Sequence, residues 1–283
     1  MKKKSRLFNL IFLVFLISSS CEDTEINRNF SSVPSVFTKK VLIEEFTGSW
    51  CGYCPSGAEI LEDLVDSLNV IGVAIHSGDY MTIEHGGFLE ESYPSSGYPS
   101  GMVDRISYED IVGLNRAWWS GFANQQLQNN AMCGLAINSE VNGDKANVEV
   151  RSAFNTEIQS ENYKLNVYLV EDNVQGEGYG FDQRNAYNTD PTSSFFEQGD
   201  PIVGYKHNNT LRVAIPSNSF GDSLSEQNIN EMAYVNTIEI DISSYNKSNL
   251  NIVAFITRIG ENVLDHEVLN VQICDIDGFQ DWD

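Results

Sequence analysis

Positive charge is scarce in this chain. Its 283 residues include 17 Lys and Arg against 40 Asp and Glu, which gives a formal net charge of −23. Nucleic acids and anionic lipid headgroups attract basic surfaces, so electrostatic attraction would not bring this chain to either of them. We therefore expect no nucleic-acid partner, and any membrane attachment has to rest on acyl chains.

The sequence also offers no apolar run at its start that is long enough to cross a bilayer. Leu7 to Ile17 is too short to span comfortably, and it follows three Lys and an Arg. Ser18-Ser19-Ser20-Cys21 comes next, and the whole arrangement resembles a bacterial lipoprotein signal. The resemblance implies a signal peptide over residues 1–20 and lipidation of Cys21; ordinary cleavage that leaves a free Cys21 is the alternative. Residues 21–38, rich in Ser, Asn and acids, are expected to form a tether.

Cysteine is sparse, with five in the whole chain. Besides Cys21, two form a CxxC pair, Cys51 and Cys54, and two remain, Cys133 and Cys274. The remaining two lie in strand-like stretches, so they either pair in a structural disulfide or stay as buried free thiols that behave as small hydrophobic groups. This usage fits an oxidising compartment.

The CxxC pair stands in Trp50-Cys51-Gly52-Tyr53-Cys54-Pro55, between an apolar strand pattern, 41–46, and a helical pattern, 55–68. A thiol at a helix start faces unpaired N–H groups and the positive end of the helix dipole, which lower its pKa. Cys51 is therefore the candidate attacking thiol, and Cys54 would resolve a mixed disulfide. A structural disulfide or half of a zinc site are the alternatives. Neither Cys133 nor Cys274 has a neighbour that would complete a zinc site, so we expect no metal and no cofactor.

At these residues the chain resembles the thioredoxin superfamily. The resemblance implies a buried acid six positions before the first cysteine, which is Glu45, with the role of accepting or relaying the proton of Cys54. It also implies a cis-proline opposite the disulfide, for which Pro99 fits better than Pro94 because an apolar strand follows it. The residue before that proline would pair with an extended substrate. The candidate substrate-binding residues are Trp50, Tyr53 and Tyr98.

The order of patterns predicts an α/β domain followed by an all-β domain. Residues 39–130 would form the thioredoxin-like domain, with further strands at 69–76 and 102–106 and a helix over 108–128. Residues 131–283 alternate between apolar and polar positions with turns between, which predicts an antiparallel β-sandwich. Its expected strands are 135–141, 146–154, 165–170, 210–215, 233–242, 250–259 and 267–273. The long segment 171–209 exceeds normal loop length and is expected to be functional or a structured extension.

Both halves together resemble a family of outer-membrane proteins named for a twenty-eight-kilodalton founding member. The residues that carry the resemblance are the 41–55 stretch, Val73-Ala74-Ile75-His76, Gly97-Tyr98-Pro99-Ser100-Gly101 and Tyr205-Lys206-His207-Asn208-Asn209-Thr210-Leu211-Arg212. The resemblance implies a lipid-anchored protein of the outer membrane, on its periplasmic or cell-surface face.

Two functions follow as hypotheses. One is a thiol-disulfide oxidoreductase, oxidase or isomerase-like, whose partners are the thiols or disulfides of other envelope proteins. The other is a surface adhesin or partner-recruiting module in which the CxxC disulfide is only structural. The Gly-Tyr pair between the cysteines is similar to that of periplasmic disulfide isomerases, and it leaves the direction of electron flow open.

Overall fold

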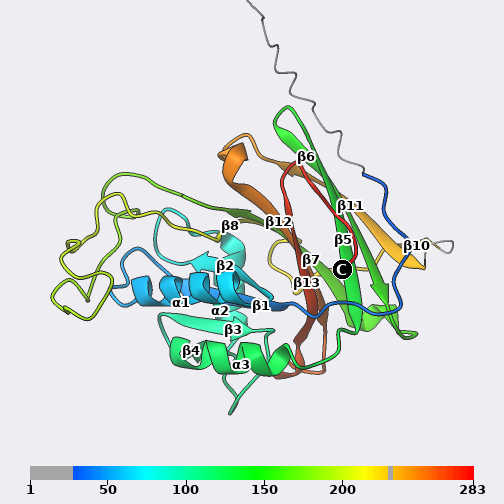
Figure 1. Cartoon of the computed structure of the whole chain (residues 1–283), viewed down its shortest axis with the longest axis horizontal. Helices are drawn as coiled ribbons and strands as arrows, with labels where there is room; N and C mark the ends of the chain where they lie inside the picture. Colours follow the sequence, from blue (N-terminus) through cyan, green and yellow to red (C-terminus); the bar gives the residue numbers. More distant parts are fainter. Residues whose placement is uncertain (1–27, 229–231) are drawn as a thin grey trace, which may run out of the picture.

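A computed structural model describes residues 28–228 and 232–283, which form two β-sheets and three α-helices (Figure 1). The expected signal peptide and Cys21 lie outside these residues. Within the described part of the chain, no helix has the length and apolar character needed to cross a membrane.

The elements follow one another in an α/β half and a β-rich half. The first half comprises β1 (Val41–Thr47), α1 (Cys54–Ser67), β2 (Val70–His76), α2 (Glu84–Ser92), β3 (Ser100–Val103), β4 (Gly113–Asn115), the 3-10 turn η1 (Arg116–Trp118) and α3 (Trp119–Gln126). The second half comprises β5 (Cys133–Asn142), β6 (Lys145–Phe154), η2 (Ser160–Asn162), β7 (Tyr163–Glu171), β8 (Thr210–Ile215), β9 (Asp222–Ser223), β10 (Glu226–Asn228), β11 (Ala233–Asp241), η3 (Lys247–Asn249), β12 (Leu250–Arg258), η4 (Val263–Asp265), β13 (Glu267–Asp275) and β14 (Phe279–Gln280).

The larger sheet takes strands from both halves. Its order is β13-β12-β7-β8-β2-β1-β3-β4, with β9 beside β7. Strands β1 and β2 are parallel, whereas β3 runs antiparallel to β1 and β4 antiparallel to β3. The two halves meet where β8 pairs with β2 at Ala74 and Thr210. The boundary expected at residue 130 is therefore crossed by one continuous sheet.

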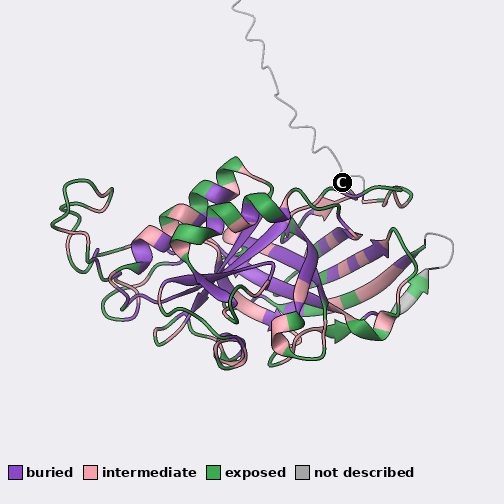
Figure 2. Ribbon diagram, turned by 90° about the horizontal axis from the view of Figure 1, so that it is seen from below, coloured by how far each residue is buried: buried purple, intermediate pink, exposed green. Residues whose placement is uncertain are grey.

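Alternation along the strands gives the larger sheet two different faces. In β1, Leu42 and Phe46 pack with α2, whereas Val41 and Ile43 pack with α1 and α3. At the other end of the sheet, β7 points Leu165, Val167 and Leu169 into a separate core shared with the second sheet. One face of the larger sheet is thus covered by α1 and α3 at one end and by the second sheet at the other (Figure 2).

The second sheet has the order β10-β11-β6-β5-β14 and packs on strands β7, β12 and β13. The fold is thus mixed α/β and dominated by β-sheet, and its two packed sheets are consistent with the expected sandwich. The strand patterns of the second half predicted its long strands well; β6 alternates between a buried and a more exposed side, whereas β7, β12 and β13 are apolar and buried along most of their length.

The helix expected over 108–128 is wrong in its first half. Glu109 and Asp110 have φ values of 49° and 63°, so the chain turns there and returns as β4 beside β3. The helix α3 begins only at Trp119, which is fully buried against Gly101, whereas Trp118 is 46% exposed. Asp and other polar residues tolerate a left-handed turn, which the helical spacing of the apolar residues did not reveal.

The described part of the expected tether is docked on the second sheet. Arg28 donates hydrogen bonds to Asn138 and to the carbonyl of Ser139, and Phe37 is 5% exposed. The backbone N–H of Thr38 donates to the carbonyl of Asp283, so this segment lies beside the C-terminal end of the chain. The segment is polar overall, but its arginine and its two aromatic residues, Phe30 and Phe37, make contacts that hold it on the folded body.

Candidate functional site

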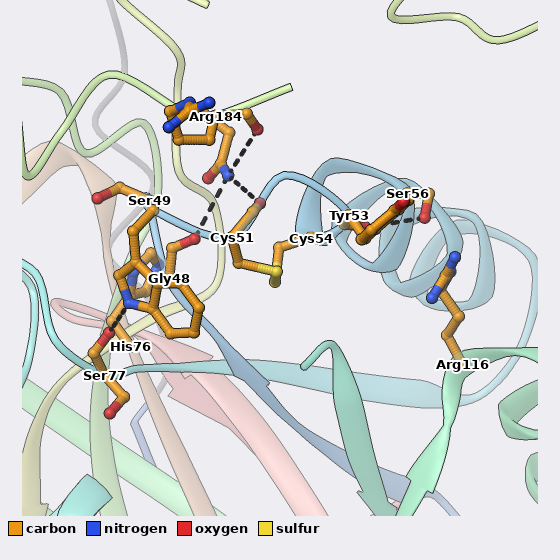
Figure 3. Close-up of a disulfide and its surroundings, with 12 residues drawn as sticks. Gly48, Ser49, Cys51, Tyr53, Cys54, Ser56, His76, Ser77, Arg116 and Arg184 are labelled. Carbon is orange, nitrogen blue, oxygen red and sulfur yellow. Dashed lines mark hydrogen bonds between the residues drawn. A yellow bond between two sulfur atoms is a disulfide. The ribbon is translucent and has the colours of Figure 1, made fainter. Parts of the chain in front are cut away.

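Cys51 and Cys54 are joined by a disulfide where the chain enters α1, with Cα atoms 5.4 Å apart. Cys54 is the first residue of the helix, and Cys51 lies in the turn before it, not in the first helical turn as expected. The N–H of Cys51 donates to the carbonyl of Gly48, which closes that turn. Figure 3 shows the disulfide at the start of α1. The sulfurs are bonded to each other, and the described residues contain no cluster of three or more His, Cys, Asp or Glu suited to a metal.

Glu45 lies in the interior between β1, α1 and Pro99. Its side chain is fully buried, and neither carboxylate oxygen has a hydrogen-bond partner among the described residues. A Cβ placed on Gly57 would lie 2.3 Å from Glu45 Oε1 and 2.9 Å from Pro99 Cβ, so the carboxyl fits against the bare backbone of α1. Burial, together with the negative charge of Glu62, raises the pKa of Glu45 well above its usual value, although Arg116 opposes this.

The Tyr98–Pro99 peptide bond is cis, as expected, and the bond before Pro94 is not among the cis bonds of the described residues. Pro99 leads directly into β3, which pairs with β1 beside Glu45. The Tyr98 ring packs edge-on against Trp50, with ring centroids 5.1 Å apart. Trp50 donates from Nε1 to the carbonyl of Ser77 and remains 40% exposed. The proline, the aromatic pair and the disulfide therefore share one end of the sheet.

A carboxyl–imidazole pair holds the strand end that precedes the cysteines. Asp79 Oδ2 accepts a hydrogen bond from the N–H of Ser49 and lies 2.7 Å from Nδ1 of His76. Burial acts to raise the pKa of Asp79, but the hydrogen bonds and charge of His76 and the N–H donors outweigh it, so the pKa is lowered. His207 packs edge-on against His76, and burial lowers its pKa to about 4. This end of the sheet is thus ordered by the carboxylate of Asp79.

A segment far along the chain covers the disulfide. We call residues 183–187, within the long connection between β7 and β8, the strap. Arg184 N–H donates to the carbonyl of Ser49 over 2.7 Å, and Ala186 N–H donates to the carbonyl of Gly52 over 2.8 Å. Beneath these contacts Cys51 is 5% exposed and Cys54 is 1% exposed.

Two further strap residues contact the site through their side chains. The amide of Gln183 donates to the carbonyls of Cys51 and Gly48 over 2.9 Å and 3.3 Å. The hydroxyl of Tyr187 lies 2.8 Å from Ser56 Oγ and accepts from Arg116, and its ring packs edge-on against Tyr53.

The structure therefore brings together every candidate residue of the first half: Cys51, Cys54, Glu45, Pro99, Trp50, Tyr53 and Tyr98. Sequence reasoning missed Asp79 and the strap residues, and the only signal for the strap was the unusual length of the segment 171–209. Cys133 and Cys274 do not join in the structural disulfide offered as one alternative; both are free and buried. Burial raises their pKa values to about 12 and about 11.

Comparisons with known proteins were made with this geometry in view. The sequence profile described as "Outer membrane protein Omp28" matches residues 88–278, more than half of the chain. No curated protein matches. The solved structure of HBP35 of Porphyromonas gingivalis is similar, with a TM-score of 0.66 and 18% identity over 85% of this chain and 76% of that one. A crystal structure from Agrobacterium tumefaciens has a TM-score of 0.47 and 10% identity over 83% of this chain and 94% of that one.

Proposed function

The chain belongs to the Omp28 family of outer membrane proteins, and we propose that it is a thiol-disulfide oxidoreductase of the cell envelope. The family match begins at residue 88 and leaves the cysteine pair outside, so membership supports the location and not the chemistry. The chemistry is argued from the arrangement around the disulfide. Lipidation of Cys21 is part of the proposal, and it would hold the protein at the membrane.

The observation that carries the proposal is the unpaired, fully buried carboxyl of Glu45 beside a CxxC disulfide. A buried acid without a hydrogen bond destabilises a fold, so a disulfide with only a structural role gives no reason for it. Supporting it, β2-β1-β3-β4 with α1 and α3 on one face has the strand order and helix positions of a thioredoxin-like domain. The cis bond before Pro99 stands where such a domain has one.

The chemistry assigned to these residues is a two-step exchange. With both cysteines reduced, the Cys51 thiolate attacks a substrate disulfide, and one substrate sulfur leaves as a thiolate. Cys54 then gives its proton to the Glu45 carboxylate and attacks Cys51, which releases the second substrate sulfur and closes the Cys51–Cys54 bond. Two electrons pass to the substrate, and the reverse sequence oxidises a substrate dithiol. A buried acid whose pKa is raised above its usual value is suited to take and return that proton.

The substrate side of the proposal rests on the surface beside the disulfide. Trp50, directly before the first cysteine, and Tyr53, between the two, are 40% and 58% exposed. With Tyr98 they would form the rim against which an extended segment of an envelope protein lies, and the backbone of Tyr98 would pair with it. The partners assigned are therefore other envelope proteins through their thiols or disulfides.

The test is a Cys54→Ala variant expressed in the envelope. Without the resolving thiol, Cys51 should remain joined to its partners, so mixed disulfides should accumulate and disappear on reduction. Cys51→Ala is the matched control and should trap nothing. Wild-type protein should also reduce insulin or rearrange a scrambled substrate. Absence of both trapped species and substrate turnover would contradict the proposal.

A second candidate function is favoured by one observation, which is the burial of both sulfurs. A disulfide that no partner reaches would only fix the start of α1, and the protein would then be a surface adhesin or recruiting module. Cys51→Ala/Cys54→Ala protein separates the two. A recruiting module should bind its partner undiminished once folding is verified, whereas an oxidoreductase should lose all exchange.

A further inference from the structure

The strap lies on the CxxC turn with the contacts that an extended peptide would make. Its backbone donates at alternate residues, from Arg184 to Ser49 and from Ala186 to Gly52. Alternate N–H groups on one edge are the pattern by which an added strand is held. Ala186 also sits closely over Gly52, since a Cβ on that glycine would lie 3.2 Å from the Ala186 Cβ.

The strap is held in place from its other side by contacts within its own loop. Asp200 accepts from Nε and Nη2 of Arg184 over 2.7 Å and 3.0 Å, and also from the N–H of Asn185. Gln183 pairs through its backbone with Ile202 in both directions. This bracing means that the strap and the 199–202 segment form one small unit above the disulfide.

Glycines with positive φ lie on both sides of the strap in its loop. Gly178 and Gly180 precede the strap and Gly199 and Gly204 follow it, all four with positive φ. Glycine reaches these conformations without the penalty of a side chain, and such residues absorb backbone changes at hinges. In Figure 1 the whole loop extends beyond the start of α1 at one end of the molecule, clear of both cores.

We propose that the strap is an internal occupant of the peptide site, so that Cys51 exchanges disulfides only in molecules whose strap has detached. This inference rests on the proposed function for its purpose, because it states how substrate access to that site is controlled. A substrate would replace the strap by donating its own backbone N–H groups to Ser49 and Gly52. Because the strap fits closely over Gly52, we expect a small substrate residue at that position. Because Tyr187 contacts Tyr53 and Arg116, we expect an aromatic substrate residue next to it.

The test is the rate at which dithiothreitol reduces the Cys51–Cys54 disulfide at neutral pH, followed by acid quenching and labelling of the new thiols. The reductant's thiolate attacks one sulfur, the other leaves as a thiolate, and the second thiol of the reductant closes on the first. Asp200→Ala removes the brace without touching the cysteines, and we expect reduction about tenfold faster or more. Gln183→Ala loosens the strap from within and should have the same effect, which guards against a folding defect in the first variant.

The matched control is Asp190→Ala. Asp190 lies in the same loop, but among the described residues its carboxylate accepts only from Thr192 two residues away, so this variant should be reduced at the wild-type rate. Equal rates for wild type, Asp200→Ala and Gln183→Ala would overturn the proposal that the strap controls access to the disulfide, while leaving the proposed exchange intact. Faster reduction of both variants, with no mixed disulfide trapped in a Cys54→Ala background, would support control of access by the strap and reject the proposed oxidoreductase function.

Discussion

Glu44 and Glu45 are consecutive and fully buried, yet their carboxylates have opposite surroundings. Because neighbours on a strand face opposite sides of the sheet, Glu44 points to the α2 side and Glu45 to the α1 side. Glu44 accepts two hydrogen bonds from Arg105, of 2.7 Å and 2.8 Å, and one from Tyr168. Glu45 has none among the described residues. The first is neutralised by a fixed partner, and the second is left free to change its protonation.

The place of Glu45 can be tested through Gly57, which leaves room for its carboxyl. Replacing glycine by alanine inside a helix ordinarily stabilises it by up to about 1 kcal/mol. In Gly57→Ala the new methyl group meets Glu45 and Pro99, so we expect a loss of about 1–3 kcal/mol instead. Gly121→Ala in α3, where nothing lies within 4 Å, should show the ordinary gain. Urea unfolding of the oxidised proteins measures both, and a stabilised Gly57→Ala protein would show that the gap is not filled as described.

At the scale of single residues the sequence predicted what lies close to the cysteines along the chain or follows a fixed spacing. Glu45 and Pro99 were found in this way. Gln183 donates to the Cys51 carbonyl although the two residues are 132 positions apart in the sequence. No local pattern marks it, because a glutamine that is buried and donates to carbonyls has the same letter in the sequence as an exposed one. Asp79 was missed for a similar reason, because α1 and β2 separate it in the sequence from its partner Ser49.

At the scale of elements the strands were predicted better than their connections. The alternating pattern of β6 and the continuous apolar pattern of β12 both matched the expected ranges closely. The hairpin between β3 and β4 was missed because β4 has only three residues and its turn is made by Glu109 and Asp110. A strand of three residues is too short to show an alternating pattern in the sequence. It forms because it can pair with the edge of β3.

Strands β5 and β13 each carry one of the free cysteines, and their burial predicts a thiol count. In protein that begins after Cys21, neither Cys133 nor Cys274 should react with Ellman's reagent while the fold is intact, because both are buried and their raised pKa values disfavour the thiolate. In denaturant, two thiols should react per molecule, and Cys133→Ala should reduce this to one. Loss of both thiols in non-reduced protein would instead establish the disulfide between these strands.

At the scale of the molecule the two halves are joined by a buried polar cluster as well as by the shared sheet. Arg105, from the first half, pairs with Glu44 on β1 and donates to the hydroxyl of Tyr168 on β7. Removing one partner of a buried ion pair leaves an uncompensated charge, which is far more costly than the loss of a surface pair. The cluster therefore makes the two halves depend on each other for stability.

We expect Arg105→Ala to lose about 3–5 kcal/mol of unfolding free energy. Arg258→Ala, which breaks an exposed pair with Glu267 between β12 and β13, should lose less than about 1 kcal/mol. Tryptophan fluorescence and far-ultraviolet circular dichroism in a urea series measure the loss. Both signals should change in a single transition for wild type, because one sheet carries both halves, and two separated transitions would contradict this coupling.

The docking of residues 28–38 on the second sheet has a consequence for how the molecule stands in the envelope. The chain leaves the fold beside its own C-terminus, and the disulfide lies at the opposite end, beneath the loop that extends beyond α1 (Figure 1). Lipidation of Cys21, as proposed, would place the anchor on the side of the second sheet, at the end of the molecule away from the disulfide. The strap would then lie at the end of the molecule that is far from the anchor.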